Sequence, residues 1–466
     1  MTPIQFHNTL SGKKEEFKPL KKTIFGTPKV GMYHCGPTVY NYIHIGNLRA
    51  FFLADITRRM FEGHGYKVKQ VMNVTDVGLL ESDNAEDKMT IALKREGKPL
   101  TLEAMRELAD FYTAAFVGDL KDLNIQLPHK LPKASEHIAE DIDVIKKLER
   151  KGLTYKIKDG IYFDTSKTDD YGKLGQVPDM ANEKSRIGMN SEKKNPRDFA
   201  LWKFNDSLGW DSPWGKGFPG WHIECSAMSM KYLGETFDIH TGGIDLIPIH
   251  HNNEIAQSEH ATGHDFAKYW LHNAFVNVGE AKMAKSAGNY ITLKTLVEKG
   301  YSPMDYRYFL LGARYSTPLS FSFEALDAAK NAYKRLTNAV CELPFGGKAD
   351  SGYWNRALAA AGDDLDTPKV LALQWEILKD ANLSPANKKA TILKIDSLLG
   401  LAKEEPQSAK ATAAPSIPAE IQKLADERIA ARAAKDWKRS DNLRLEIESL
   451  GYDVKDTTED QKLTKK

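Results

Sequence analysis

The first 75 residues alternate between two hydrophobic patterns. The segment VGMYHC (30–35) is a short apolar run typical of a buried strand, and YKVKQVMNVTD (66–76) predicts a second strand. Between them, apolar side chains recur every four residues, at Leu48, Phe52, Ile56 and Met60. That spacing predicts a helix with one buried face, for which Asn47 is the expected N-cap. The order strand, helix, strand predicts a parallel sheet.

The rest of the chain changes pattern several times. Residues 155–220 are rich in turn-forming residues, strand-like runs return at 236–240 and 273–279, and residues 320–400 have helical patterns. We therefore predict a doubly wound parallel α/β domain of the Rossmann type, split by an insertion and followed by an all-α stem and a small helical C-terminal domain. The expected boundaries are 1–120 and 221–315 for the two halves of the α/β domain, 121–220 for the insertion, 316–400 for the stem, 401–420 for an Ala-, Pro- and Ser-rich linker and 421–466 for the C-terminal helices.

The length and composition of the chain exclude several classes of protein. A chain of 466 residues is too long for one compact core. No apolar run is long enough to cross a bilayer, and the start of the chain does not resemble a secretory signal. Three cysteines cannot build a disulfide framework in a chain of this size, so we expect a cytoplasmic protein whose Cys and His act as metal ligands or catalysts. The charges nearly cancel, with 65 basic and 63 acidic residues, so binding of nucleic acid would need a local basic surface.

The tetrapeptide His44-Ile45-Gly46-Asn47 lies between the first predicted strand and the helix. Ligands bind at this edge of a parallel sheet, and the start of a helix attracts phosphate. His44 can donate a hydrogen bond to a phosphoryl oxygen, and Gly46 lets a nucleotide approach the backbone. The alternative is an ordinary loop histidine, because four residues often match by chance.

Two lysines, Lys282 and Lys285, stand in the glycine-flanked segment GEAKMAKSAGN (279–289). Such lysines can neutralise charge that develops on a triphosphate, although a solvated basic turn is the common alternative. Gly242 and Gly243 would let adenine or ribose approach the backbone, with Asp245 near a hydroxyl group. This second signal is weak by itself.

Together, HIGN and KMAKS resemble the paired signature of the class I aminoacyl-tRNA synthetases. The resemblance implies that His44, Asn47, Lys282 and Lys285 stabilise charge on the phosphates of ATP, which Mg²⁺ accompanies. Two positions depart from the usual pattern, since Asn47 replaces a His and Ala284 replaces a Ser. The amide of Asn47 can still donate a hydrogen bond to phosphate, so we expect activity to survive.

Four residues form a candidate metal site. His250 and Glu254 are four residues apart and would share one face of a helix. Cys35 and Cys225 add two thiolates, and Zn²⁺ accepts this set of donors. Spacing alone does not identify the site, because the cysteines could be inert buried thiols and His251 is a rival ligand.

Several longer segments occur in the order found in cysteinyl-tRNA synthetases, and the chain resembles that family from about residue 5 to 450; these segments are EEFKPL, MYHCGPTVY, NVTDV, WDSPWGKGFPGWHIECSAMS, DIHTGGIDL and HHNNEIAQSE. The resemblance implies one zinc ion per chain, held by Cys35, Cys225, His250 and Glu254. It also implies that the thiolate of the substrate cysteine binds zinc, which separates Cys from Ser. Thr75 and Trp221 match residues around that substrate.

The implied activity is ATP-dependent joining of L-cysteine to tRNA(Cys), and we expect a monomer. Two alternatives remain: a mycothiol-type cysteine ligase, which lacks the C-terminal domain, and an inactive homologue that binds tRNA. The final helices favour tRNA, since basic residues surround Trp437, namely Arg428, Arg432, Lys435, Lys438, Arg439 and Arg444. Interleaved acidic residues make a solvated helix face the alternative. The family usually ends with a strand after the dipeptide Asp-Thr that carries a Gly and a Trp, which help to read the anticodon. After Asp456-Thr457 this chain has neither, so we expect altered reading of the anticodon or a share of the stacking by Trp437.

Overall fold

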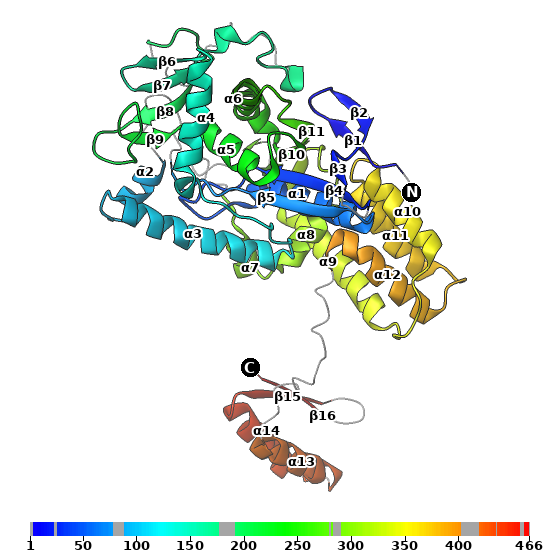
Figure 1. Ribbon diagram of the computed structural model, residues 1–466. Coiled ribbons are helices and arrows are strands. Elements are labelled where there is room, and N and C mark those ends of the chain that lie inside the picture. The colour runs from blue at the N-terminus through cyan, green and yellow to red at the C-terminus, as the bar shows by residue number, and fades with distance from the viewer. Residues whose placement is uncertain are drawn as a thin grey trace. The chain divides into compact units, whose positions relative to one another are not determined.

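The computed structural model describes residues 3–22, 26–77, 88–176, 192–278, 281–282, 290–401, 419–434, 436–456 and 461–465. The chain divides into two compact units, Met1–Leu401 and Ala402–Lys466 (Figure 1). None of the described helices combines the length and the apolar character needed to cross a membrane.

A five-stranded sheet lies at the centre of the larger unit (Figure 1). Its four longer strands are parallel and lie in the order β11 (Ala267–Asn273), β10 (Phe237–Gly243), β4 (Pro28–His34) and β5 (Lys67–Met72). The short β3 (Lys21–Lys22) pairs antiparallel with the start of β4. The predicted parallel α/β class is confirmed.

The two faces of the sheet pack into separate cores. Met32 and Leu271 belong to the cluster that includes the buried side of α1 (Ile45–Gly63). Tyr33 and Trp270, their neighbours in sequence, belong to a second cluster with residues of α5 (Trp221–Leu233). Because successive strand residues point to opposite faces, helices cover both sides of the sheet, as a doubly wound fold requires.

The strand-like run 273–279 does contain a strand, β12 (Val276–Val278), but this strand lies in a separate three-stranded sheet with β13 (Ala281–Lys282) and β14 (Leu319–Phe321), and the strand next to β10 is β11. The prediction of the first N-cap was wrong. The N-cap of α1 is His44 and not Asn47. His44 Nδ1 accepts the backbone N–H of Asn47 at 3.2 Å, so an imidazole does what an Asp or Ser side chain usually does.

The turn-rich middle of the chain contains four strands that the sequence pattern did not predict. They form an antiparallel sheet in the order β6 (Thr154–Ile157), β7 (Gly160–Phe163), β8 (Phe199–Phe204) and β9 (Gly217–Pro219). Trp202 is completely buried there. The helices before this sheet are α2 (Lys88–Arg95), α3 (Leu102–Asp122) and α4 (Ile138–Arg150), and the N-terminal hairpin is β1 (Gln5–Asn8) with β2 (Lys13–Glu16).

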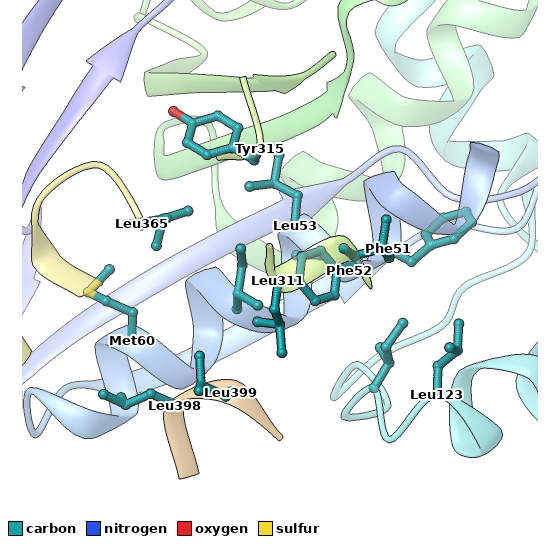
Figure 2. Close-up of a cluster of buried hydrophobic side chains, with 14 of the residues drawn as sticks. Phe51, Phe52, Leu53, Met60, Leu123, Leu311, Tyr315, Leu365, Leu398 and Leu399 are labelled. Carbon is teal, nitrogen blue, oxygen red and sulfur yellow. The ribbon is translucent and has the colours of Figure 1, made fainter. Parts of the chain in front are cut away.

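The region predicted as an all-α stem, 316–400, is helical apart from β14, and it packs against α1. Its helices are α9 (Phe323–Cys341), α10 (Ser351–Gly362), α11 (Thr367–Lys379) and α12 (Pro385–Leu399), and they follow α7 (Leu293–Glu298) and α8 (Pro303–Leu311). Figure 2 shows Phe52 and Met60 of α1 among Leu311 of α8 and Leu399 at the end of α12. The apolar face predicted for the first helix therefore joins the α/β domain to the stem.

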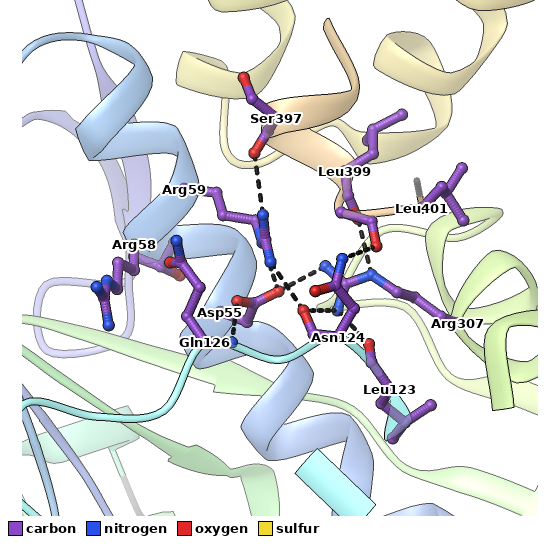
Figure 3. Close-up of polar contacts among 12 residues, drawn as sticks. Asp55, Arg58, Arg59, Leu123, Asn124, Gln126, Arg307, Ser397, Leu399 and Leu401 are labelled. Atoms are coloured by element: carbon purple, nitrogen blue, oxygen red, sulfur yellow. Dashed lines mark hydrogen bonds and ion pairs between the residues drawn. The ribbon is translucent and has the colours of Figure 1, made fainter. Parts of the chain in front are cut away.

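A buried polar network crosses the same junction (Figure 3). Arg307 of α8 and Asp55 of α1 are both fully buried and form an ion pair at 2.5 Å. Arg307 also donates to the carbonyl groups of Leu123 and Leu399, each at 2.8 Å. Arg59 binds the same carboxylate of Asp55 at 2.8 Å.

The smaller unit contains two helices and a hairpin. Helices α13 (Ala419–Ala433) and α14 (Trp437–Ser449) were expected. The antiparallel pair β15 (Tyr452–Asp456) and β16 (Gln461–Lys465) was not, so this unit is not purely helical.

Candidate active site and metal centre

The parallel strands end at one edge of the sheet, and the residues after β4 and β5 line the candidate site. The N–H of Cys35 donates to the carbonyl of Thr241 at the end of β10, 3.3 Å away. The N–H of Gly36 donates to Asn73 Oδ1 at 2.8 Å. A side chain at Gly36 would overlap the carbonyl oxygen of Asn73, so only glycine allows the two loops to meet here.

Three further side chains converge on Cys35. Cys225 lies on α5, His250 on a π-turn (Ile247–His251), and Glu254 on α6 (Asn252–Thr262). The donor atoms of these three residues and Cys35 all lie within 4.8 Å of one another. The structure therefore brings together the four side chains predicted as ligands, and their chemistry fits Zn²⁺.

The buried carboxylate of Glu254 has an environment that suits a bound cation. Within the described part of the chain, neither of its oxygen atoms has a hydrogen-bond partner, although it is completely buried. His240 Nε2 approaches Oε2 to 3.0 Å but does not reach hydrogen-bond geometry. Burial raises the pKa of Glu254 and of Cys35 well above their usual values. Without a positive charge these groups stay neutral, and a dication would favour their ionised forms.

A second set of donors shares two members with the first. The donor atoms of Cys35, His240, His251 and Glu254 also lie within 4.8 Å of one another. His251 Nε2 is 3.3 Å from Cys35 Sγ. Geometry alone therefore leaves His251 as a rival of His250, but only the first set offers two thiolates, which Zn²⁺ favours.

Trp221 lies beside this centre, and Thr75 lies beside the loop that follows Cys35, where its N–H donates to the carbonyl of Pro37 at 3.0 Å. The ring centroids of Trp221 and His250 are 4.3 Å apart. Thr75 is 2% exposed, and its Oγ1 accepts a hydrogen bond from Asn73 Nδ2 at 3.1 Å.

Sequence reasoning missed His222, His240 and His272, which surround the centre. His222 Nδ1 lies 2.9 Å from His250 Nδ1, which leaves Nε2 of His250 to face Glu254, 3.6 Å from Oε1. His251 Nδ1 lies 2.7 Å from His272 Nε2. The adjacency of His222 to Trp221 was the only signal in the sequence, because these contacts join separate elements.

The start of α1 lies against the chain that follows the predicted lysine segment. The N–H of Ile45 donates to the carbonyl of Ile291 at 2.8 Å, and the rings of His44 and Tyr290 have centroids 5.2 Å apart. The backbone of Lys282 lies in β13. Lys285 lies outside the described residues, so its predicted role stays a prediction.

Comparison with known proteins identifies the family. The model of the class I (C) tRNA synthetase catalytic domain matches residues 22–331, and the cysteinyl-tRNA ligase anticodon-binding domain matches residues 414–462. A cysteine–tRNA ligase of Burkholderia lata is 43% identical and covers 99% of this chain and 97% of its own length. That of Treponema denticola is 42% identical and covers 97% and 98%. The chain belongs to the cysteine–tRNA ligases.

Solved structures agree with this family at the level of the fold. A methionyl-tRNA synthetase of Mycobacterium tuberculosis, bound to methionyl-adenylate, superposes with a TM-score of 0.54 at 15% identity, covering 80% of this chain and 90% of that one. The AgnB2 LeuRS of Agrobacterium radiobacter K84, in a ternary complex with tRNA and LeuAMS, gives 0.60 at 11% identity, covering 83% and 84%.

In this ligase, Gly242 and Gly243 end β10 directly beside the histidines. A side chain at Gly242 would come within 2.7 Å of the His251 ring. Asp245 is exposed in the following short turn. The nucleotide contacts predicted for Gly242, Gly243 and Asp245 stay a prediction.

The predicted tRNA-binding residues of the ligase separate into two groups. Trp437 is 60% exposed, and the exposed Arg439 pairs with Glu427 at 3.2 Å. Arg428 is only 2% exposed, which corrects the expected basic surface at this position. It shares a helix face with Ile421 and Ala425, which are buried too. Arg432 is half-buried, and Lys435 lies outside the described residues.

Proposed function

We propose that this ligase activates L-cysteine with ATP and transfers it to the 3′ end of tRNA(Cys), with one resident zinc ion held by Cys35, Cys225, His250 and Glu254. The observation that carries the proposal is the convergence of these four donors at the edge of the sheet where α1 begins. One strand–loop–helix segment contains both Cys35 and His44, so it joins the amino-acid pocket to the ATP site.

Bound zinc would supply a centre that takes a thiolate in preference to an alcohol, which separates cysteine from serine. The residues of the chain provide the rest of the pocket. Trp221 packs beside His250 and limits the space next to the metal ligands. The hydroxyl of Thr75 is held by Asn73 and serves as a polar contact for the substrate. Discrimination then lies in binding, and no editing step is required.

The start of α1 would stabilise the phosphates. The backbone N–H of Asn47 donates a hydrogen bond to His44 Nδ1, so this nitrogen carries no proton in the neutral ring. The proton then lies on Nε2, which can donate to a phosphoryl oxygen. The helix N-terminus adds a partial positive charge. In the reaction, the carboxylate of cysteine attacks the α-phosphorus of ATP and releases pyrophosphate. We assign Lys282 and Lys285 to the charge that develops on the phosphates, together with Mg²⁺.

The C-terminal unit supports tRNA as the acceptor, because its match to an anticodon-binding domain is what a ligase for an amino sugar would lack. The test is cysteine-dependent ATP–pyrophosphate exchange, followed by charging of total tRNA with labelled cysteine and a parallel reaction with the amino sugar. Exchange with charging of tRNA supports the proposal. Exchange with transfer to the sugar alone, or no exchange, would refute it.

A further inference from the structure

Arg49, one turn into α1, is a buried arginine whose hydrogen bonds to the described residues all go to backbone carbonyl groups. It is 1% exposed. Its Nη1 donates to the carbonyls of Ala274 at 3.0 Å and Phe275 at 2.8 Å. Its Nη2 donates to those of Arg314 at 3.0 Å and Thr317 at 2.7 Å. No ion pair of Arg49 occurs within the described residues, so four neutral carbonyls solvate this cation.

The four carbonyls belong to the beginnings of two neighbouring strands. Residues 274–275 lead into β12, and residues 314–317 lead into β14. The two strands pair in parallel, with Val276 opposite Leu319. The segments also bond to each other, since the N–H of Ala274 donates to Tyr315 at 2.9 Å. Arg49 thus fixes both strands to the helix that begins beside His44.

Strand β12 in turn orients the backbone of the first predicted lysine. It pairs with β13, in which Lys282 lies opposite Asn277. Beyond residues 283–289, the chain meets α1 again, where Ile291 accepts the N–H of Ile45. Helix α1 therefore contacts the chain on both sides of the KMAKS segment, through Arg49 before it and through Ile45 after it.

We propose that Arg49 is a positioning residue for ATP activation, which holds β12 and β13 in place relative to the phosphate-binding start of α1. The inference rests on the proposed function of Lys282. Arg49 does not touch substrate in this scheme. It acts through the strand that carries the lysine.

The chemistry of the position requires a guanidinium. Burial lowers the pKa of Arg49 to about 10, so the group stays charged at neutral pH. A planar guanidinium presents five N–H groups in a fixed fork, which can serve two pairs of carbonyls at once. An ammonium group is a single point with three donors and cannot span both pairs. Arg49→Lys should therefore keep the charge but lose part of the alignment.

The test compares Arg49→Met and Arg49→Lys with wild type in ATP–pyrophosphate exchange. We expect kcat/KM for ATP to fall by about 10²-fold in Arg49→Met, the scale of loss when reacting groups are misplaced by about 1 Å. The loss in Arg49→Lys should be smaller but still clear. KM for cysteine and the zinc content should stay within about twofold of wild type, because Arg49 does not contact the metal centre.

The matched control is Arg58→Met on the same helix. Arg58 also donates to a carbonyl, that of Leu127 at 3.0 Å, but far from the lysine segment in the chain. It should not change the kinetics with ATP. Unchanged ATP kinetics in a folded Arg49→Met, or in Arg49→Lys should Arg49→Met fail to fold, would overturn the inference. A rise in KM for cysteine as large as the fall in kcat/KM for ATP, or a loss of zinc, would also overturn it, since either result indicates a general loss of structure. Absence of exchange in wild type would instead refute the proposed function.

Discussion

The network of Asp55 and Arg307 offers the sharpest test of how α1 is held to α8 and to the end of the stem helix α12. Both side chains are fully buried, and the pair connects α1 to α8 (Figure 3). Arg307→Met would keep most of the side-chain volume but leave the carboxylate of Asp55 without its nearest cation. It would also remove the donor to the carbonyls of Leu123 and Leu399.

The size of the effect follows from what remains after the substitution. Removing one member of a buried pair typically costs about 3–5 kcal/mol. Asp55 would keep Arg59 at 2.8 Å and the N–H of Gln126 at 2.9 Å, which places the loss near the lower end of that range. The measurement is the apparent free energy of unfolding in urea, with Arg356→Met as the control. Arg356 pairs with Glu376 at an exposed site, so its loss should cost no more than about 1 kcal/mol. Equal effects of the two substitutions would refute the reasoning.

The pH dependence of stability provides a second test of the same ion pair. Burial alone would raise the pKa of Asp55, but Arg307, Arg59 and the N–H of Gln126 more than offset it and hold the pKa below its usual value. A carboxyl group with a lowered pKa stabilises the fold above its unfolded-state pKa of about 3.9 and loses this contribution as the pH falls through the folded value. Wild type should therefore lose stability below about pH 4 more steeply than Arg307→Met. An identical acid dependence would contradict the assignment.

Three further predictions address the site and the C-terminal unit. Cys225→Ser should abolish the zinc content of protein purified without added metal, and an unchanged content would exclude Cys225 as a ligand. Lys285→Ala should slow pre-steady-state formation of the adenylate by about 10²–10³-fold, with little change in cysteine binding, and a rate within a few-fold of wild type would remove Lys285 from catalysis. Ending the chain near residue 405 should leave pyrophosphate exchange largely intact, because the first unit ends at Leu401, but should weaken tRNA binding. Charging of tRNA with unchanged kcat/KM would show that α13 and α14 do not serve the anticodon.

The periodicity of apolar residues correctly predicted elements that bury one face and expose the other. The four-residue spacing of Leu48 and Phe52 predicted the buried side of α1, because one face of that helix meets the core. The antiparallel strands of the insertion were missed because they are short and do not alternate: β7 is buried at all four positions, and β9 has only three residues. The burial of Arg428 could not be predicted from charge alone, because its helix face is set by the packing of α13 with its neighbours.

The candidate metal centre shows a different limit of prediction from sequence. The spacing of His250 and Glu254 correctly predicted that these two side chains face the same way. Cys35 and Cys225 are 190 positions apart, and only the fold brings them together. The contacts of His222 with His250 and of His251 with His272 have no signature in spacing, because each joins two elements. The same holds for Arg49, whose four carbonyl partners lie more than 200 residues away.

One consequence of the fold is that recognition of the amino acid and its activation share a short segment. Cys35 follows β4 and His44 is the N-cap of the next helix, so a loop of eight residues is a short covalent path from the metal centre to the phosphate site. Its two ends are fixed independently, by Thr241 and Asn73 at Cys35 and by Ile291 at Ile45. A displacement of the metal ligand therefore need not disturb the phosphate site. Loss of zinc should accordingly abolish binding of cysteine while ATP still binds, because the contacts that hold the start of α1 do not involve the metal ligands.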